Sequence, residues 1–254
     1  MAKKFNFIIS RRMLSITIPL FILFNSCAKE KHSNQLKNKL ELRNTYQLNI
    51  PEPSGLTLSP DRKSLFTVSD ETGMVYVLST GGKLLRSFKV HGEDLEGITF
   101  INDSTIAVVL ERSREIIFCN TDGTELEKIS TGLKGDLNSG LEGIAYDSSE
   151  GEFYLINEKT PALLIKADKN LKIFFTKVIN YVSDLSGLSL SEDFLWILSD
   201  ESKLIAKCDK EGEVIETYKI PVQQPEGIAV NSEQDLIYIV SDFTGILYVF
   251  KFIH

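Results

Sequence analysis

Histidine, cysteine and tryptophan are scarce in this chain of 254 residues, which has three histidines, three cysteines and one tryptophan. Protein zinc sites are built from His and Cys ligands at close spacing, and no such pattern accompanies the acidic residues. Basic residues are also in the minority, with 28 Lys and Arg against 35 Asp and Glu and a net charge of −7. Nucleic-acid binding needs a basic stripe, so the composition argues against DNA and RNA as partners.

Other absences concern the fold and the chemistry. No 3.6-residue apolar period appears between the strand-like runs, which argues against an α/β barrel or a doubly wound sheet. No cofactor motif is present, and neither a Ser-His-Asp order nor a nucleophile elbow marks a serine hydrolase. With 43% hydrophobic residues, the chain is still long enough for one domain with a sizeable core.

The first 26 residues have the features of an export signal. A basic start is followed by the apolar run MLSITIPLFILF, residues 13–24, which is shorter than the roughly 20 residues needed to span a bilayer. Ser26 directly precedes Cys27, an arrangement that resembles a lipobox, so we expect cleavage before Cys27 and lipidation of that residue. An uncleaved anchor helix with an incidental cysteine is the alternative.

Residues 27–41 are polar and lack apolar periodicity, which predicts a flexible tether. Ala28 and Lys29 differ from the aspartate that commonly retains bacterial lipoproteins in the inner membrane, so an outer-membrane address is favoured. The sequence therefore predicts an exported, lipid-anchored protein of the cell envelope, with a signal peptide at 1–26, a tether at 27–41 and a folded domain at 42–254.

Five similar segments make up the folded domain. Each carries a marker glycine, and the five are Gly55, Gly97, Gly143, Gly187 and Gly227, so the unit repeats every 40 to 46 residues. Each unit has the pattern of four short strands, with hairpin turns such as TGGK, TDGT and KEGE. Four-stranded units with this period predict a β-propeller with one blade per unit.

The fifth unit ends at His254 after its third strand, which would leave an open sheet edge. Residues 42–50, LRNTYQLNI, resemble the fourth strands LLRSFKV and VIETYKI and are predicted to complete this blade. The expected fold is all-β, a five-bladed propeller closed by its N-terminal strand, because no residues remain for a sixth blade. We expect a monomer. Cys119 and Cys208 fall in blades that are not neighbours, so we expect buried free thiols.

Acidic residues recur at the end of the second strand of every unit. The octets LFTVSDET, IAVVLERS, FYLINEKT, LWILSDES and IYIVSDFT have an acid at the sixth position and a hydroxyl at the eighth. The acids are Asp70, Glu111, Glu158, Asp200 and Asp242. An acid and a hydroxyl at this spacing can cap the turn that follows, so a structural role and a ligand role are both open.

A second set of acids precedes the marker glycines. In three units this residue is glutamate, namely Glu96, Glu142 and Glu226, and in the others it is Ser54 or Ser186. In a propeller blade the first strand lines the channel and the second runs antiparallel beside it, so both sets of acids should meet at one mouth of the channel. Glu142 and Glu158 are expected to meet there.

Such a gathering of carboxylates needs compensation. Two carboxylates about 5 Å apart repel by roughly 3 kcal/mol at an effective dielectric of about 20. Protonation or a bound cation would offset that repulsion, and an irregular cage of oxygen ligands suits Ca²⁺ better than Mg²⁺. We predict a calcium site at Glu96, Glu142 and Glu226, with the five strand-end acids as further ligands.

The five repeats, the LEGI and PEGI strand starts and the lipoprotein-like N-terminus together resemble the SdiA-regulated family, which is related to the NHL-repeat propellers. The resemblance covers about residues 42–254. It implies a five-bladed propeller with a calcium ion at a shared site, which carries the metal expectation onto Glu96, Glu142 and Glu226. Ser54 and Ser186 depart from that pattern because they lack the acid.

Two functions fit these features. The first is a binding or scaffold module, with an unknown small molecule or protein at the channel face. The alternative is a calcium-dependent hydrolase of an ester, lactone or phosphoester, since distantly similar six-bladed propellers use a channel calcium to polarise such bonds. A hydrolase needs a general base with a pKa near 7. His91, in VHGEDLEG, is the catalytic candidate, and Asp94 and Asp184 occupy matching loop positions.

Overall fold

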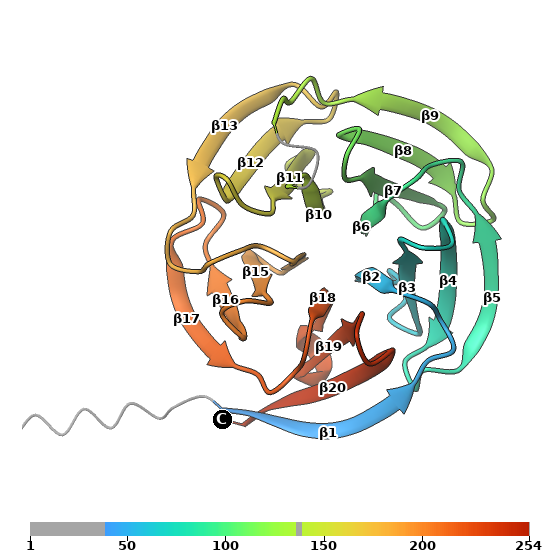
Figure 1. Ribbon diagram of the computed structural model, residues 1–254, viewed down its shortest axis with the longest axis vertical. Helices are drawn as coiled ribbons and strands as arrows, with labels where there is room; N and C mark the ends of the chain where they lie inside the picture. Colours follow the sequence, from blue (N-terminus) through green and yellow to red (C-terminus); the bar gives the residue numbers. More distant parts are fainter. Residues whose placement is uncertain (1–38, 136–138, 254) are drawn as a thin grey trace, which may run out of the picture. The chain divides into compact units, whose positions relative to one another are not determined.

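A computed structural model describes residues 39–135 and 139–253, and they form five four-stranded antiparallel sheets arranged as blades around a central axis (Figure 1). The predicted all-β, five-bladed propeller is confirmed. The predicted signal peptide and the lipidation site Cys27 lie outside the described residues. Within the described parts of the chain, no helix is long and apolar enough to cross a membrane.

In each of the first three blades, four consecutive strands of the chain run from the innermost to the outermost position. Blade 1 contains β2 (Pro53–Leu58), β3 (Ser64–Ser69), β4 (Met74–Ser79) and β5 (Leu84–Lys89). Blade 2 contains β6 (Leu95–Phe100), β7 (Thr105–Leu110), β8 (Glu115–Asn120) and β9 (Glu125–Ser130). Blade 3 contains β10 (Leu141–Asp147), β11 (Glu152–Asn157), β12 (Leu163–Asp168) and β13 (Ile173–Val178).

The last two blades complete the ring. Blade 4 contains β14 (Gly187–Ser191), β15 (Phe194–Ser199), β16 (Leu204–Cys208) and β17 (Val214–Lys219). Blade 5 contains β18 (Pro225–Asn231), β19 (Leu236–Ser241), β20 (Ile246–Ile253) and, as its outermost strand, β1 (Lys39–Gln47). A short 3₁₀ helix, Ser232–Gln234, joins β18 to β19.

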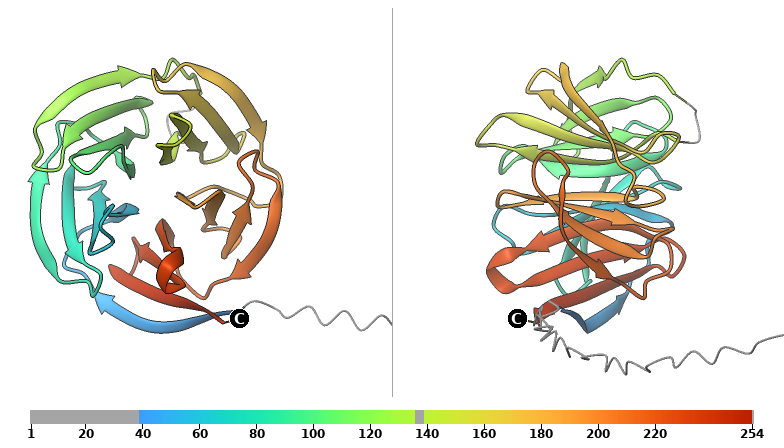
Figure 2. Two further views of the ribbon diagram at one scale, coloured as in Figure 1. Left: turned by 180° about the vertical axis from the view of Figure 1, so that it is seen from behind. Right: turned by 90° about the vertical axis from the view of Figure 1, so that its left-hand side faces the viewer.

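The N-terminal strand closes the ring as predicted. β1 pairs antiparallel with β20, from Lys39 opposite Ile253 to Gln47 opposite Ile246, and Figure 2 shows the blue first strand lying along the red last one. The strand begins at Lys39, inside the range 27–41 that the sequence assigns to the tether. The difference arises because β20 continues to Ile253 and offers backbone partners to residues 39–41.

The core lies between the blades. In β7 the side chains from Ile106 to Leu110 are all buried, because the faces of a blade's middle strands pack against the neighbouring blades. This explains why the second strand of each unit is a continuous apolar run, whereas the outermost strands carry exposed residues. Cys119 in β8 and Cys208 in β16 are buried free thiols, as predicted.

The marker glycines lie where the innermost strands of neighbouring blades touch. A Cβ atom on Gly55 would lie 2.0 Å from the carbonyl oxygen of Glu96, and one on Gly97 would lie 2.9 Å from the Cα of Gly143. A Cβ on Gly227 would lie 2.8 Å from the carbonyl carbon of Gly55, which joins the last blade to the first. The two remaining marker glycines are less crowded by backbone, since a Cβ on Gly143 would first meet the side chain of Ile156 at 2.9 Å and one on Gly187 would lie 3.0 Å from the carbonyl oxygen of Glu226. At Gly55, Gly97 and Gly227 only glycine allows this approach, since a Cβ would collide with backbone.

We expect Gly55→Ala to destabilise the propeller by about 1–3 kcal/mol or more, because the new methyl group forces β2 away from β6. Chemical denaturation measures the change. Gly81→Ala is the control, since its Cβ would meet nothing closer than 3.8 Å. Equal stability of the two variants would show that the inner strands are not held by this contact.

Candidate metal centre

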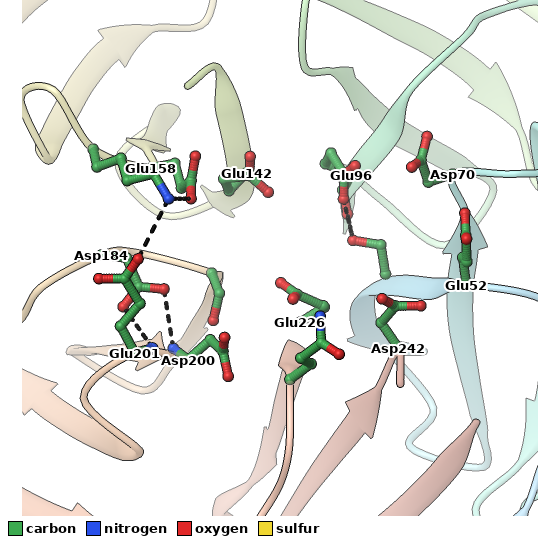
Figure 3. A pocket seen from close by; sticks show the side chains of 14 residues that line it. Glu52, Asp70, Glu96, Glu142, Glu158, Asp184, Asp200, Glu201, Glu226 and Asp242 are labelled. Atoms are coloured by element: carbon green, nitrogen blue, oxygen red, sulfur yellow. Dashed lines mark hydrogen bonds and ion pairs between the residues drawn. The ribbon is translucent and has the colours of Figure 1, made fainter. Parts of the chain in front are cut away.

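A cavity of about 400 Å³ opens on the axis, at the end of the channel where the innermost strands begin (Figure 3). It is strongly acidic. Among the described residues, its lining contains one basic side chain, Lys159, and three uncharged ones, Ser54, Ser186 and Gln224. The ten acidic lining residues are Glu52, Asp70, Glu96, Glu142, Glu158, Asp184, Asp200, Glu201, Glu226 and Asp242. Seven of the eight predicted ligands are in that set, and the eighth, Glu111, lies beside it.

Backbone hydrogen bonds hold the strand-end acids against the cavity. In four blades the N–H of the sixth-position acid donates to the carbonyl of the residue three places before the marker glycine. The pairs are Asp70 with Glu52, Glu111 with Asp94, Glu158 with Gly140, and Asp242 with Gln224. In blade 4 the N–H of Asp200 donates instead to the carboxylate of Asp184, at 3.2 Å. Each bond ties the end of a second strand to the loop that enters the first strand, which fixes the acid at the channel mouth.

In three blades a serine at the fifth octet position, not the sixth-position acid, caps the turn after the second strand. The hydroxyls of Ser69, Ser199 and Ser241, at the fifth octet position, each accept the N–H of the eighth residue at 3.2 Å. Asp70 and Asp242 accept no hydrogen bond from their own turns within the described residues. The capping role that the sequence left open for the acids therefore belongs to their neighbours in these three blades. The carboxylates of Asp70 and Asp242 line the cavity, whereas that of Asp200 also accepts the ammonium group of Lys203 at 2.5 Å.

Three carboxylates come together more closely than the rest. Glu111, Glu142 and Glu158 each offer an oxygen within 4.8 Å of the other two, and this is the one such group among the described residues. The expected meeting of Glu142 and Glu158 is confirmed. Glu111 reaches across from blade 2 toward blade 3, and its carboxylate accepts the N–H of Gly140, directly before β10, at 3.1 Å.

Glu96 and Glu226, the other two favoured ligands, line the cavity but are not part of this group. The hydroxyl of Ser54 donates to the carboxylate of Glu96 (Figure 3). Ser186 also reaches the next blade around the ring, where its hydroxyl donates to the carbonyl of Pro225 at 2.7 Å. The two serines that replace acids in the repeat thus join neighbouring inner strands.

Burial and mutual repulsion favour the protonated forms of the inner glutamates. Burial is the main cause that raises the pKa of Glu96 to about 8 and that of Glu226 to about 9. The pKa of Glu142 is also raised well above its ordinary value, first by burial and then by the charges of Glu96 and Glu111. At neutral pH, Glu96 and Glu226 therefore hold protons unless a cation replaces them.

Asp94 and Asp184, the acids that the sequence placed at matching loop positions, are both engaged by other residues. Asp184 is 3% exposed, and its carboxylate accepts the hydroxyl of Ser199 at 2.5 Å as well as two turn N–H groups, so it organises the turn of blade 4. Asp94 forms an ion pair with Arg112 at 3.2 Å.

His91 does not line the cavity. Its side chain is 80% exposed, and its Nδ1 lies 3.7 Å from a carboxylate oxygen of Glu125. Its catalytic role stays a prediction.

Sequence reasoning missed Glu52, Glu201 and Lys159. Glu52 lies three residues before its marker glycine, at the position that Asp94 and Asp184 occupy in their units, so alignment of the loops would have found it. Glu201 and Lys159 are seventh residues of their octets, where the five units share no residue type. No signal in the repeat marks that position.

The donor set of this cavity suits a hard cation. Its described lining offers carboxylate and hydroxyl oxygens and contains neither histidine nor cysteine. Calcium accepts six to eight such oxygens in irregular geometry, and Glu111, Glu142 and Glu158 provide the close group around which such a shell can form. The residues therefore fit Ca²⁺ better than zinc.

Comparisons with known proteins agree with the fold. A family model described as SdiA-regulated matches residues 31–251. A solved structure, the glutaminyl cyclase of Myxococcus xanthus, has a TM-score of 0.69 over 86% of this chain and 99% of that one, at 12% sequence identity. That likeness concerns the fold alone. The match over nearly the whole propeller confirms the resemblance seen in the sequence, and the chain belongs to the SdiA-regulated family.

Proposed function

We propose that this protein is a lipid-anchored binding module of the cell envelope whose propeller holds a calcium ion at the channel mouth. The observation that carries the proposal is the group formed by Glu111, Glu142 and Glu158, with oxygens within 4.8 Å of one another beside a cavity lined by ten acids. Like charges at this separation are unfavourable without a proton or a cation.

The three residues of this group would hold the ion, and the other cavity acids would raise its affinity through their negative field. The ion would also join blades, because Glu111 belongs to blade 2 and Glu142 and Glu158 belong to blade 3. A cavity of about 400 Å³ has room for more than one ion. The proposed role is therefore to present a rigid, partly neutralised mouth to a small molecule or to a protein segment.

Calcium should stabilise the protein, and EDTA should lower its melting temperature. A ligand at about a hundredfold its Kd adds about 2.7 kcal/mol to the free energy of unfolding. For a domain of this size that corresponds to a shift of roughly 5–10 °C. Glu142→Gln should abolish the shift, whereas Glu127→Gln, an exposed acid on β9, should leave it intact. Thermal melts with EDTA and with added Ca²⁺ measure the effect, and no response to either would reject the ion.

The same experiment has a definite pH dependence. The raised pKa values mean that the calcium-free folded state binds more protons than the unfolded chain above the ordinary pKa of 4.5, so its stability falls as the pH rises toward about 9. Glu142, one of the three proposed ligands, also has a raised pKa, so calcium must displace a proton there. The stabilising effect of calcium should therefore be larger near about pH 8.5 than near about pH 6. A shift that shrinks with rising pH would contradict this account.

The lipid anchor is a separate part of the proposal and rests on the basic start, the apolar run of residues 13–24 and the Ser26–Cys27 pair. Cys27→Ala should prevent lipidation and move the protein from the membrane fraction to the soluble fraction. Cell fractionation and metabolic labelling with a radioactive fatty acid measure both changes. Unlabelled wild-type protein would reject the anchor, and Cys119→Ala serves as a control cysteine variant.

A calcium-dependent hydrolase is the second candidate. The observation that favours it is Glu226, a cavity acid whose pKa of about 9 keeps it protonated at neutral pH, as a general acid must be. Calcium, when bound, would polarise an ester, lactone or phosphoester bond as a Lewis acid. Within the cavity, Glu226 would donate a proton to the leaving oxygen as its bond to the substrate carbon or phosphorus breaks, while an ionised carboxylate of the lining would accept a proton from the attacking water.

The enzyme hypothesis predicts calcium-dependent turnover on a panel of lactone, aryl ester and phosphodiester substrates. Glu226→Gln should reduce any activity by about 10²–10⁴-fold, as loss of a general acid does. His91→Ala tests the predicted catalytic role of His91, and an unchanged rate would show that this exposed side chain takes no part. An inactive panel with intact calcium binding would favour the binding module.

A further inference from the structure

Lys159 is the single basic residue in the described lining of the cavity, and its backbone is held firmly. Its N–H donates to the hydroxyl of Ser139 at 3.2 Å, and its carbonyl accepts hydrogen bonds from that hydroxyl and from the side chain of Asn157. The side chain therefore starts from a fixed point at the channel mouth. The equivalent positions of the other four units are occupied by glutamate in two units, arginine in one and phenylalanine in one, namely Glu71, Glu201, Arg112 and Phe243.

The ammonium group of Lys159 lies between two carboxylates from neighbouring blades. Its Nζ is 2.7 Å from Oε1 of Glu158 and 3.4 Å from Oε1 of Glu201, and dashed lines mark both pairs in Figure 3. Glu158 is one of the three residues proposed to hold calcium, whereas Glu201 is not. Of the described ion pairs, the one between Lys159 and Glu158 is the only one that engages this group of three.

A divalent ion and the Lys159 ammonium group compete for the carboxylate of Glu158. A unit positive charge beside a divalent ion is repelled, and the ammonium already lies at hydrogen-bond distance from the carboxylate. The Lys159 side chain is 42% exposed, and ion pairs of that kind are weak, so a calcium ion can displace it. Glu201, which is 50% exposed, offers the displaced ammonium a partner farther from the group of three.

We propose that Lys159 is an internal counter-cation that competes with calcium for Glu158, an inference that rests on the proposed calcium site. The lysine neutralises Glu158 when the ion is absent and withdraws toward Glu201 when the ion binds. Competition of this kind lowers the affinity for calcium.

The test is isothermal titration calorimetry with calcium chloride on the folded protein and three variants. Lys159→Gln removes the competing charge and should bind calcium about tenfold more tightly. Lys159→Arg keeps the charge and should bind like wild type. Lys89→Gln is the matched control, because the Lys89 ammonium donates to the carbonyl of Thr72 at 2.6 Å and has no carboxylate partner among the described residues. Its affinity should not change.

The outcomes separate this inference from the calcium site itself. If neither wild type nor Lys159→Gln binds calcium, the proposed site is wrong and the competition falls with it. If wild type binds and Lys159→Gln binds equally tightly, the site stands and the competition is wrong. An equal gain in Lys89→Gln would also overturn it, because a general charge effect would then explain the result. Binding by Lys159→Gln alone would support a lysine that blocks the site. Melting temperatures in EDTA confirm that each variant is folded.

Discussion

The contact between the innermost strands of neighbouring blades is the constraint on which the rest of the structure depends. Five strands approach one axis so closely that Gly55, Gly97 and Gly227 leave no room for a Cβ atom beside the backbone of the next blade. Because the residues before these glycines lie on the same strands, the contact also fixes how near their side chains come to one another. The acidic cavity is thus a consequence of the same packing that closes the ring.

That packing concentrates negative charge that the protein must neutralise. The fold holds the acids mainly with backbone hydrogen bonds, such as that from Asp242 to Gln224, and supplies few opposing charges. Three kinds of compensation are compatible with the geometry. Glu96 and Glu226 retain protons because their pKa values are raised. The ammonium group of Lys159 neutralises Glu158. A bound calcium ion would replace some of these protons and this ammonium group.

Differences between the five units make one part of the acidic cavity a better cation site than the rest. Ser54 and Ser186 replace acids and use their hydroxyls to join neighbouring strands. The close group lies in blades 2 and 3, where Glu111 reaches toward Glu142 and Glu158. The repeat therefore provides the ring of carboxylates, and the differences between the repeats decide where a cation can bind best and where Lys159 interferes.

The sequence by itself determined the number of blades, the closing strand and the face on which the acids gather. These features follow from periodic patterns of apolar residues, glycines and turns, which reflect local geometry and hold wherever the unit recurs. The sequence also predicted that Glu142 and Glu158 meet, but only the tertiary structure decided which third acid joins them. The sequence favoured Glu96, Glu142 and Glu226, whereas the close group contains Glu142 with Glu111 and Glu158. The tertiary structure also showed that Asp184 holds a turn and that the ammonium group of Lys159 pairs with Glu158. Such contacts depend on side-chain direction and on loop paths between blades, and neither is encoded by position within a repeat.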